Sequence, residues 1–159
     1  MKRVLLAGCV LALTLSWTAR AQGKPDFSGT WTMDPTRSES AMQADPIGPV
    51  MLVITQTPSE LKIATTRAQK TTTETYKLDG SESKIAGGSA KARWDGSTLV
   101  IDAVHDVQGA SVTTKEARSL ASNGNEMIVE TVVEVQHGYS IKGAKNYSAG
   151  KDVYTRLRQ

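Results

Sequence analysis

Hydrophobic and polar side chains alternate along most of the chain after residue 26. In residues 27–33, for example, Phe27, Trp31 and Met33 share one face and polar side chains occupy the other. A repeat of two residues is the signature of a β-strand with one buried face. The same alternation occurs in residues 61–66, 90–94, 99–103, 127–135 and 153–158. Together with the less regular runs, the pattern predicts about nine or ten strands.

Turn signals separate these runs. Asp79-Gly80, Asp95-Gly96 and Asn123-Gly124 stand between alternating segments, as expected for hairpins. No stretch has a helical hydrophobic stripe longer than two turns. Residues 35–49 contain three prolines and predict an irregular crossing, and residues 137–150 are polar and rich in glycine, as in a long loop.

One run differs from the others. Residues 50–55 are almost entirely apolar and rich in β-branched side chains. This composition predicts a strand that is buried on both faces.

An antiparallel sheet of this size, with local connections, must close or cover its edges, and a barrel does so. The sequence therefore predicts an all-β chain, with residues 22–159 forming a single antiparallel up-and-down β-barrel of about 8–10 strands. A β-sandwich is the alternative.

The first 21 residues have the features of a cleaved signal peptide. A basic start at Lys2 and Arg3 precedes an apolar run, and Ala19-Arg20-Ala21 has the small-residue form of a cleavage site. The apolar run continues well past Cys9, which argues against lipidation there. We therefore expect the protein to be secreted or periplasmic.

Removal of this segment changes the charge. Three of the 19 lysines and arginines lie within it, which leaves 16 against 16 acidic residues. A neutral chain is a poor candidate for binding nucleic acid or an anionic membrane surface. The single cysteine lies in the same segment, so we expect neither a disulfide nor a thiolate site.

The sequence lacks the common catalytic and cofactor motifs. It contains no phosphate-binding glycine loop and no nucleophile elbow. His105 and His137 are isolated, which makes a metal site a poor interpretation. Glu126, Glu130 and Glu134 share one strand face, which predicts a row facing solvent. We expect no metal and no cofactor.

The segment Phe27-Ser28-Gly29-Thr30-Trp31 resembles the opening strand of the calycins, the superfamily of lipocalins and fatty-acid-binding proteins. The longer run Gly29–Ser38 resembles the start of small secreted bacterial proteins that open G-T-W-x-[LM]-[DN]-P-x-[KR]-S. In calycins a basic residue of the last strand packs across this tryptophan. The resemblance therefore implies that Arg156 or Arg158 lies over Trp31.

The later hairpins resemble those of fatty-acid-binding proteins. That resemblance implies that Arg118 and Arg156 hold a ligand carboxylate, with Tyr154 in place of the usual tyrosine. Alternation within residues 153–158 contradicts the role of Arg156 in ligand binding, since it predicts that Val153 and Leu157 face inward and Arg156 faces outward. Residues 35–49 are also too few for the helical lid of those proteins.

These observations predict a secreted, non-catalytic barrel that binds a small hydrophobic or amphipathic molecule. The expected ligand-binding residues are Trp31, Trp94, Arg118, Tyr154 and Arg156. One alternative is a filled barrel that binds a cell-envelope component through residues 35–49 and 137–150. Another is an enzyme that uses Glu74, Arg93 or His105. We expect no nucleic-acid partner and no membrane span in residues 22–159.

Overall fold

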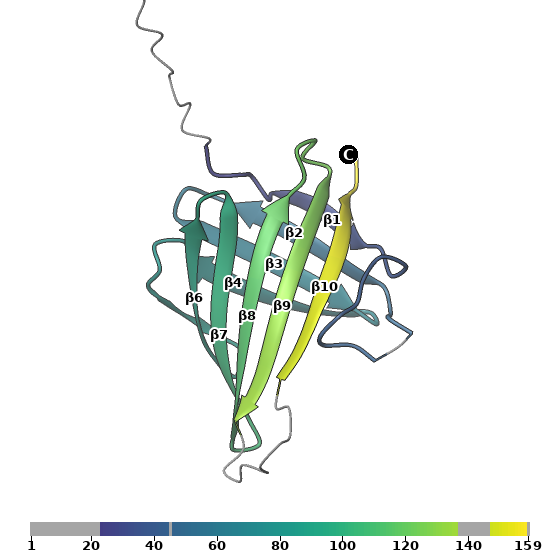
Figure 1. Cartoon of the computed structure of the whole chain (residues 1–159). Coiled ribbons are helices and arrows are strands. Elements are labelled where there is room, and N and C mark those ends of the chain that lie inside the picture. The colour runs from purple at the N-terminus through teal and green to yellow at the C-terminus, as the bar shows by residue number, and fades with distance from the viewer. Residues whose placement is uncertain (1–22, 45, 137–146, 159) are drawn as a thin grey trace, which may run out of the picture.

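The computed structural model describes residues 23–44, 46–136 and 147–158. They form ten antiparallel strands in one sheet, with the order β4-β3-β2-β1-β10-β9-β8-β7-β6-β5 (Figure 1). The strands are β1 (Gly29–Met33), β2 (Val50–Gln56), β3 (Glu60–Arg67), β4 (Lys70–Lys77), β5 (Glu82–Ile85), β6 (Gly88–Asp95), β7 (Thr98–Val107), β8 (Ala110–Leu120), β9 (Glu126–Gln136) and β10 (Tyr147–Arg156).

The sheet curls into a nearly closed barrel. Strands β4 and β5 stand at opposite ends of the strand order, and the backbone N–H of Lys77 donates to the Ser83 hydroxyl at 2.8 Å between them. The predicted single up-and-down barrel is confirmed, and the sandwich alternative is not observed. All ten strands belong to one continuous sheet, in which β1 pairs with β10, so the described residues contain no two separate sheets that could pack face to face as in a sandwich.

One end of the barrel is filled by a packed core, and we call it the closed end. Trp31, Phe27, Leu61, Leu99 and Met127 are fully buried there. Residues 23–28, the turn between β8 and β9, and the C-terminal end of β10 all lie at one end of the molecule in Figure 1. The alternation of the sequence points one face of each strand into this core.

Arg156 covers Trp31 at the closed end. Its guanidinium carbon lies 4.3 Å from the centre of the indole ring, as the calycin resemblance implies. The same side chain donates to the carbonyl oxygens of Ser28, Asp26 and Gly124. Gly29 has a φ of 133°, a conformation that favours glycine, and a Cβ there would lie 3.2 Å from Arg156 Nη1, so the guanidinium would have to shift slightly.

The expectation from alternation alone, with Val153 and Leu157 inward and Arg156 outward, is wrong. Arg156 shares the inward face with Tyr154, and Leu157 is exposed. Val153 is buried together with Asp152 and Tyr154, so burial in this strand does not alternate. The segment that follows β1 lies beside β10 here and hydrogen-bonds to the backbone of Val153 and Lys151.

We call this segment, residues 34–42, the strap. Beyond the last β1 pair, the strap follows the same edge of β10. The N–H of Asp34 donates to the Val153 carbonyl at 2.8 Å, and Glu39 exchanges two backbone hydrogen bonds with Lys151. The hydroxyl of Ser38 accepts a hydrogen bond from the Val153 N–H at 3.0 Å.

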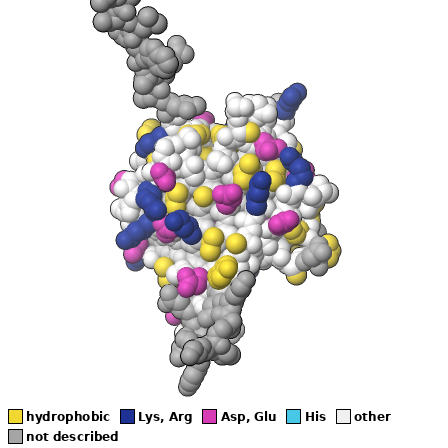
Figure 2. All heavy atoms as spheres, viewed as in Figure 1, with side chains coloured by type: hydrophobic (Ala, Val, Ile, Leu, Met, Phe, Trp, Pro, Cys, Tyr) yellow, Lys and Arg dark blue, Asp and Glu magenta, His cyan; other side chains and the backbone are white. Residues whose placement is uncertain are grey.

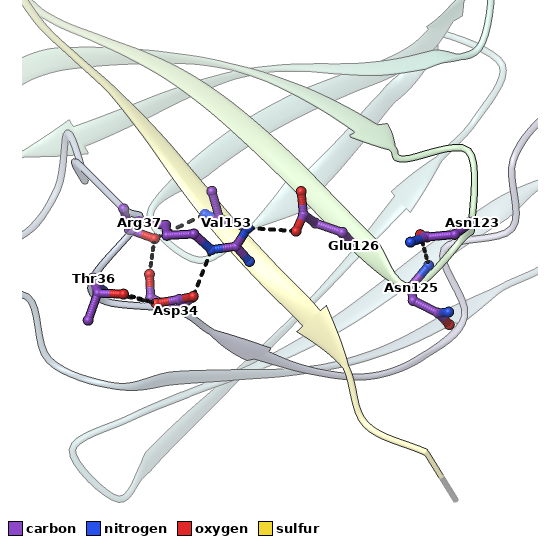
Figure 3. A network of polar contacts seen from close by, with 8 residues as sticks. Asp34, Thr36, Arg37, Asn123, Asn125, Glu126 and Val153 are labelled. Carbon is purple, nitrogen blue, oxygen red and sulfur yellow. Dashed lines mark hydrogen bonds and ion pairs between the residues drawn. The ribbon is translucent and has the colours of Figure 1, made fainter.

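A polar network fastens the start of the strap to β9 (Figure 3). Arg37 binds Asp34 at 2.7 Å and Glu126 at 2.8 Å. Hydrogen bonds from Thr36 and Arg37 lower the pKa of Asp34 to about 2. The predicted row of acids is therefore confirmed on the outer face, where Glu130 and Glu134 are exposed and Glu126 takes part in this ion pair.

The prediction for residues 50–55 is wrong. Val50, Leu52 and Ile54 are buried in the barrel, but Met51 is 40% and Val53 is 44% exposed on its outer face. Apolar composition alone cannot distinguish a strand with two covered faces from one whose outer residues happen to be apolar.

Side chains of both charges lie among hydrophobic ones on the outer surface shown in Figure 2. In the part of the chain that the structure describes, no helix has the length and apolar character needed to cross a membrane. The predicted signal peptide with Cys9, His137 and most of the loop 137–150 lie outside the described residues.

Candidate functional site

A cavity of about 370 Å³ lies within the barrel, beside the packed core. Its lining comes from the inward faces of β3, β4, β7 and β8 and from Met42 of the strap. Apolar contributions come from Met42, Ile63, Ile101 and Ala103, and polar ones from Thr65, Arg67, Lys70, Thr72, Glu74, Tyr76, His105, Thr114, Glu116 and Arg118. The volume is in the range of small-molecule sites, but the lining is unusually polar for one.

Arg118 is the most buried cation of the cavity, with a side chain that is 8% exposed. Its Nη2 donates to Glu116 Oε2 at 2.5 Å. Within the described residues, Nε and Nη1 of Arg118 have no hydrogen-bond partner. Burial on its own lowers the pKa of Arg118, but Glu116, Tyr154 and Tyr76 together outweigh it, so the pKa lies above its usual value. The group therefore remains cationic, with donors left for a ligand.

Glu74 and Tyr76 lie on β4 and contribute a second pair. The hydroxyl of Tyr76 donates to Glu74 Oε2 at 2.5 Å. Burial and the Glu74 carboxylate raise the pKa of Tyr76 far above its usual value. Tyr76 also interacts electrostatically with Glu116 and Arg118. We refer to Glu74, Tyr76, Glu116 and Arg118 as the polar cluster.

Further buried polar groups lie on β10 and β3. Burial raises the pKa of Asp152, whose Oδ2 accepts a hydrogen bond from the Ser40 hydroxyl of the strap at 3.3 Å. Burial raises the pKa of Tyr154 to about 12. Both interact electrostatically with Arg67 and Arg118. Neither Asp152 nor Tyr154 lines the cavity, so they act on its cations electrostatically from outside the lining.

The structure separates the five predicted ligand-binding residues. Arg118 lines the cavity, and Tyr154 is buried within its electrostatic reach. Trp31 and Arg156 form the cap of the closed end. Trp94 stacks on Phe27, with ring centres 6.0 Å apart, in a surface depression that includes Lys24 and Leu78. These last three do not line the cavity.

The candidates for an enzyme are also divided. Glu74 and His105 line the cavity, whereas Arg93 lies on the outer surface and pairs with Asp102. The ring Nδ1 of His105 lies 3.3 Å from the Ala86 carbonyl oxygen. Across the described ranges, no group of three His, Cys, Asp or Glu side chains could hold a metal ion.

Sequence reasoning missed Tyr76 and Glu116 as site residues. Glu116 stands two residues before Arg118 on the same strand, so the two share a face, and this spacing could have identified it. Tyr76 carries no comparable signal, because β4 and β8 are not neighbours in the sheet. Only closure of the barrel brings the two strands to the same cavity.

Chemically, the cavity offers a fixed cation with unused N–H groups, flanked by carboxylates and a phenol. A buried guanidinium is well suited to a carboxylate or another oxygen acceptor. The geometry therefore fits an acceptor group of a small molecule, with its apolar part against Ile63, Ile101 and Met42.

Solved structures with a similar fold are known, although sequence comparisons find no relative. No protein-family model matches the chain, and no curated protein matches its sequence. Among solved structures, human cRBP IV has a TM-score of 0.57 at 17% identity, covering 83% of this chain and 98% of its own.

Two further structures have similar values. The zebrafish ileal bile acid-binding protein complexed with cholic acid has a TM-score of 0.57 at 13% identity, covering 82% of this chain and 98% of its own. Fatty-acid-binding protein 1 of Echinococcus granulosus has a TM-score of 0.54 at 16% identity, covering 83% and 98%. At these identities the likeness shows a calycin-like barrel fold and nothing finer.

Proposed function

We propose that this protein binds a small amphipathic molecule in the barrel cavity, with an anionic acceptor group of that molecule at Arg118. The observation that carries the proposal is the Arg118 side chain, 8% exposed and with Nε and Nη1 unpartnered among the described residues. A buried donor without a partner costs free energy, and a charged one costs more. A ligand oxygen at this position removes that cost.

The fold neighbours support the barrel interior as the binding place. One was solved with cholic acid and another is named a fatty-acid-binding protein. The apolar part of a ligand would contact Ile63, Ile101 and Ala103, with Met42 of the strap at its side. The predicted signal peptide extends the proposal to a protein that acts outside the cytoplasm.

The proposal is binding without catalysis. Acid–base catalysis works best with a group whose pKa lies near the operating pH. The pKa values of Tyr76 and Arg118 are both raised, so the phenol stays protonated and the guanidinium stays charged at neutral pH. Such groups can hold and orient a ligand, but they do not exchange protons readily.

The test is a titration with 11-(dansylamino)undecanoic acid, followed by dansyl fluorescence. We expect the Arg118→Gln variant to bind at least about tenfold more weakly, the order expected for loss of hydrogen bonds to a charged group. Arg93→Gln is the matched control, because Arg93 pairs with Asp102 on the outer surface.

Arg118→Lys keeps the charge without the planar guanidinium, so we expect an intermediate affinity. Circular dichroism and thermal unfolding establish that each variant is folded. Equal affinity of the wild type and folded Arg118→Gln, or no binding of the probe by the wild type, would contradict the proposal.

A further inference from the structure

The cavity contains carboxylates, which a site for an unsubstituted fatty acid would not need. Glu74 and Glu116 both line the cavity, and each uses Oε2 to bind a partner within the polar cluster. The Glu116 side chain is 23% exposed, and within the described part of the chain Oε1 of neither carboxylate is a buried atom left without a partner. An ionised carboxylate oxygen accepts hydrogen bonds only, so a ligand group that contacts either carboxylate must be a donor.

The charge of the lining limits what those donors can be. Three cationic side chains, Arg67, Lys70 and Arg118, face two carboxylates. Asp152 is hydrogen-bonded to Ser40 and is not part of the lining. Asp152 nevertheless interacts electrostatically with Arg67 and Arg118 from outside the lining. Within the lining itself, a ligand with a single negative charge balances the surplus of one cation. The donor on the ligand could be an ammonium or a hydroxyl group. An ammonium would cancel the negative charge of the ligand, so a neutral hydroxyl is the better donor.

The position of the hydroxyl follows from the contact between Glu116 and Arg118. Their bond joins Glu116 Oε2 to Arg118 Nη2 at 2.5 Å, and Oε1 is attached to the same carboxylate carbon. A ligand carboxylate at the free N–H groups of Arg118 therefore lies beside a carboxylate acceptor. A hydroxyl near the acid end can reach Glu116, whereas one at the far end of a chain cannot.

From this arrangement we infer that the ligand is a hydroxylated anionic amphiphile whose hydroxyl lies within a few bonds of its acid group, as in a 3-hydroxy carboxylic acid. The inference rests on the proposed function. Arg118 binds the carboxylate, and Glu116, with Glu74 nearby in the polar cluster, accepts a hydrogen bond from the hydroxyl. No bond is made or broken.

Calorimetric titration of the purified protein tests the inference with four acids of one chain length. They are dodecanoate, 3-hydroxydodecanoate, 12-hydroxydodecanoate and 3-aminododecanoate. We expect the 3-hydroxy acid to bind about tenfold more tightly than dodecanoate, as one hydrogen bond to a charged acceptor can supply. The 12-hydroxy acid should show no such advantage.

The variants Glu116→Gln and Glu74→Gln identify the acceptor. Removing a carboxylate strengthens the binding of every anion, so the informative quantity is the affinity ratio between the 3-hydroxy acid and dodecanoate. We expect this ratio to fall below about threefold in Glu116→Gln. Glu130→Gln, on the outer face of β9, is the matched control and should leave the ratio unchanged.

A ratio near one in the wild type, or a ratio that survives in both cavity variants, overturns the inference. Tighter binding of 3-aminododecanoate than of the 3-hydroxy acid overturns the assignment of a hydroxyl. If the dansyl probe binds through Arg118 while the hydroxyl gives no advantage, the inference fails and the proposed function stands. If neither the probe nor any of the acids binds, both fail.

Discussion

At the scale of single residues, the short motif around Trp31 joins local conformation to a long-range contact. Gly29 adopts a positive φ and leaves room for Arg156, whose guanidinium then lies on the indole ring. The indole N–H donates to the Phe27 carbonyl at 2.9 Å. One end of the barrel is thus sealed by residues from both ends of the described chain.

We expect Trp31→Ala to reduce the free energy of unfolding by about 3–5 kcal/mol, because the indole is fully buried. Urea denaturation of the variant and the wild type measures the difference. Trp94→Ala is the comparison, since Trp94 is only half-buried and should cost less. A loss below about 1 kcal/mol for Trp31→Ala would contradict the role of the indole in the core.

At the scale of elements, the strap is the distinctive part of this barrel. It crosses the inward face of β10 at Gly150, where an added Cβ would lie 2.2 Å from both the Glu39 carbonyl oxygen and the Ala41 nitrogen. These are backbone atoms, so no side-chain rotation can relieve the clash. The strap also brings Ser40 to Asp152 and Met42 to the cavity.

Gly150→Ala should therefore displace the strap and lower the free energy of unfolding by about 1–3 kcal/mol, as overpacking does. Gly48→Ala is a matched control in the same connection, because its Cβ would meet only the Gln43 side chain, at 3.6 Å. Chemical denaturation compares the two variants. Equal stability of Gly150→Ala and the wild type would show that the strap does not pack against this position.

At the scale of the whole molecule, the barrel is closed by two different devices. Strands β1 and β10 pair through a backbone ladder, whereas between β4 and β5 the Ser83 hydroxyl accepts from the Lys77 N–H. The interior is likewise divided into a packed apolar core and a polar cavity. A side-chain hydrogen bond therefore joins β4 to β5, whereas backbone hydrogen bonds join β1 to β10.

We expect Ser83→Ala to leave the Lys77 N–H, whose hydrogen bond to Ser83 is part-buried, without its acceptor and to cost about 0.5–1.5 kcal/mol. Hydrogen exchange should accelerate at the Lys77 amide more than at amides of the β1–β10 ladder. Ser119→Ala on β8 is the control. Unchanged exchange at Lys77 would mean that this hydroxyl does not hold the seam.

Local physical chemistry made much of the fold predictable from the sequence. Strand period, turn dipeptides and the pattern around Trp31 predicted an antiparallel barrel, because each depends on a few neighbouring residues. Arg118 could be proposed as a ligand-binding residue through its resemblance to a known family. Glu116 was within reach as well, because two residues on one strand always share a face.

Other features depend on which surfaces meet after folding. Val153 is buried although Tyr154 and Arg156 hold the inward face of β10, so alternation in this strand could not show that Arg156 faces Trp31. The exposure of Met51 and Val53 likewise depends on no second layer covering β2. Tyr76 joins Arg118 only because closure places β4 and β8 around one cavity. The sequence by itself determined the strands and their inward faces, whereas the tertiary structure decided which of those faces meet, since that depends on contacts between residues far apart in the chain.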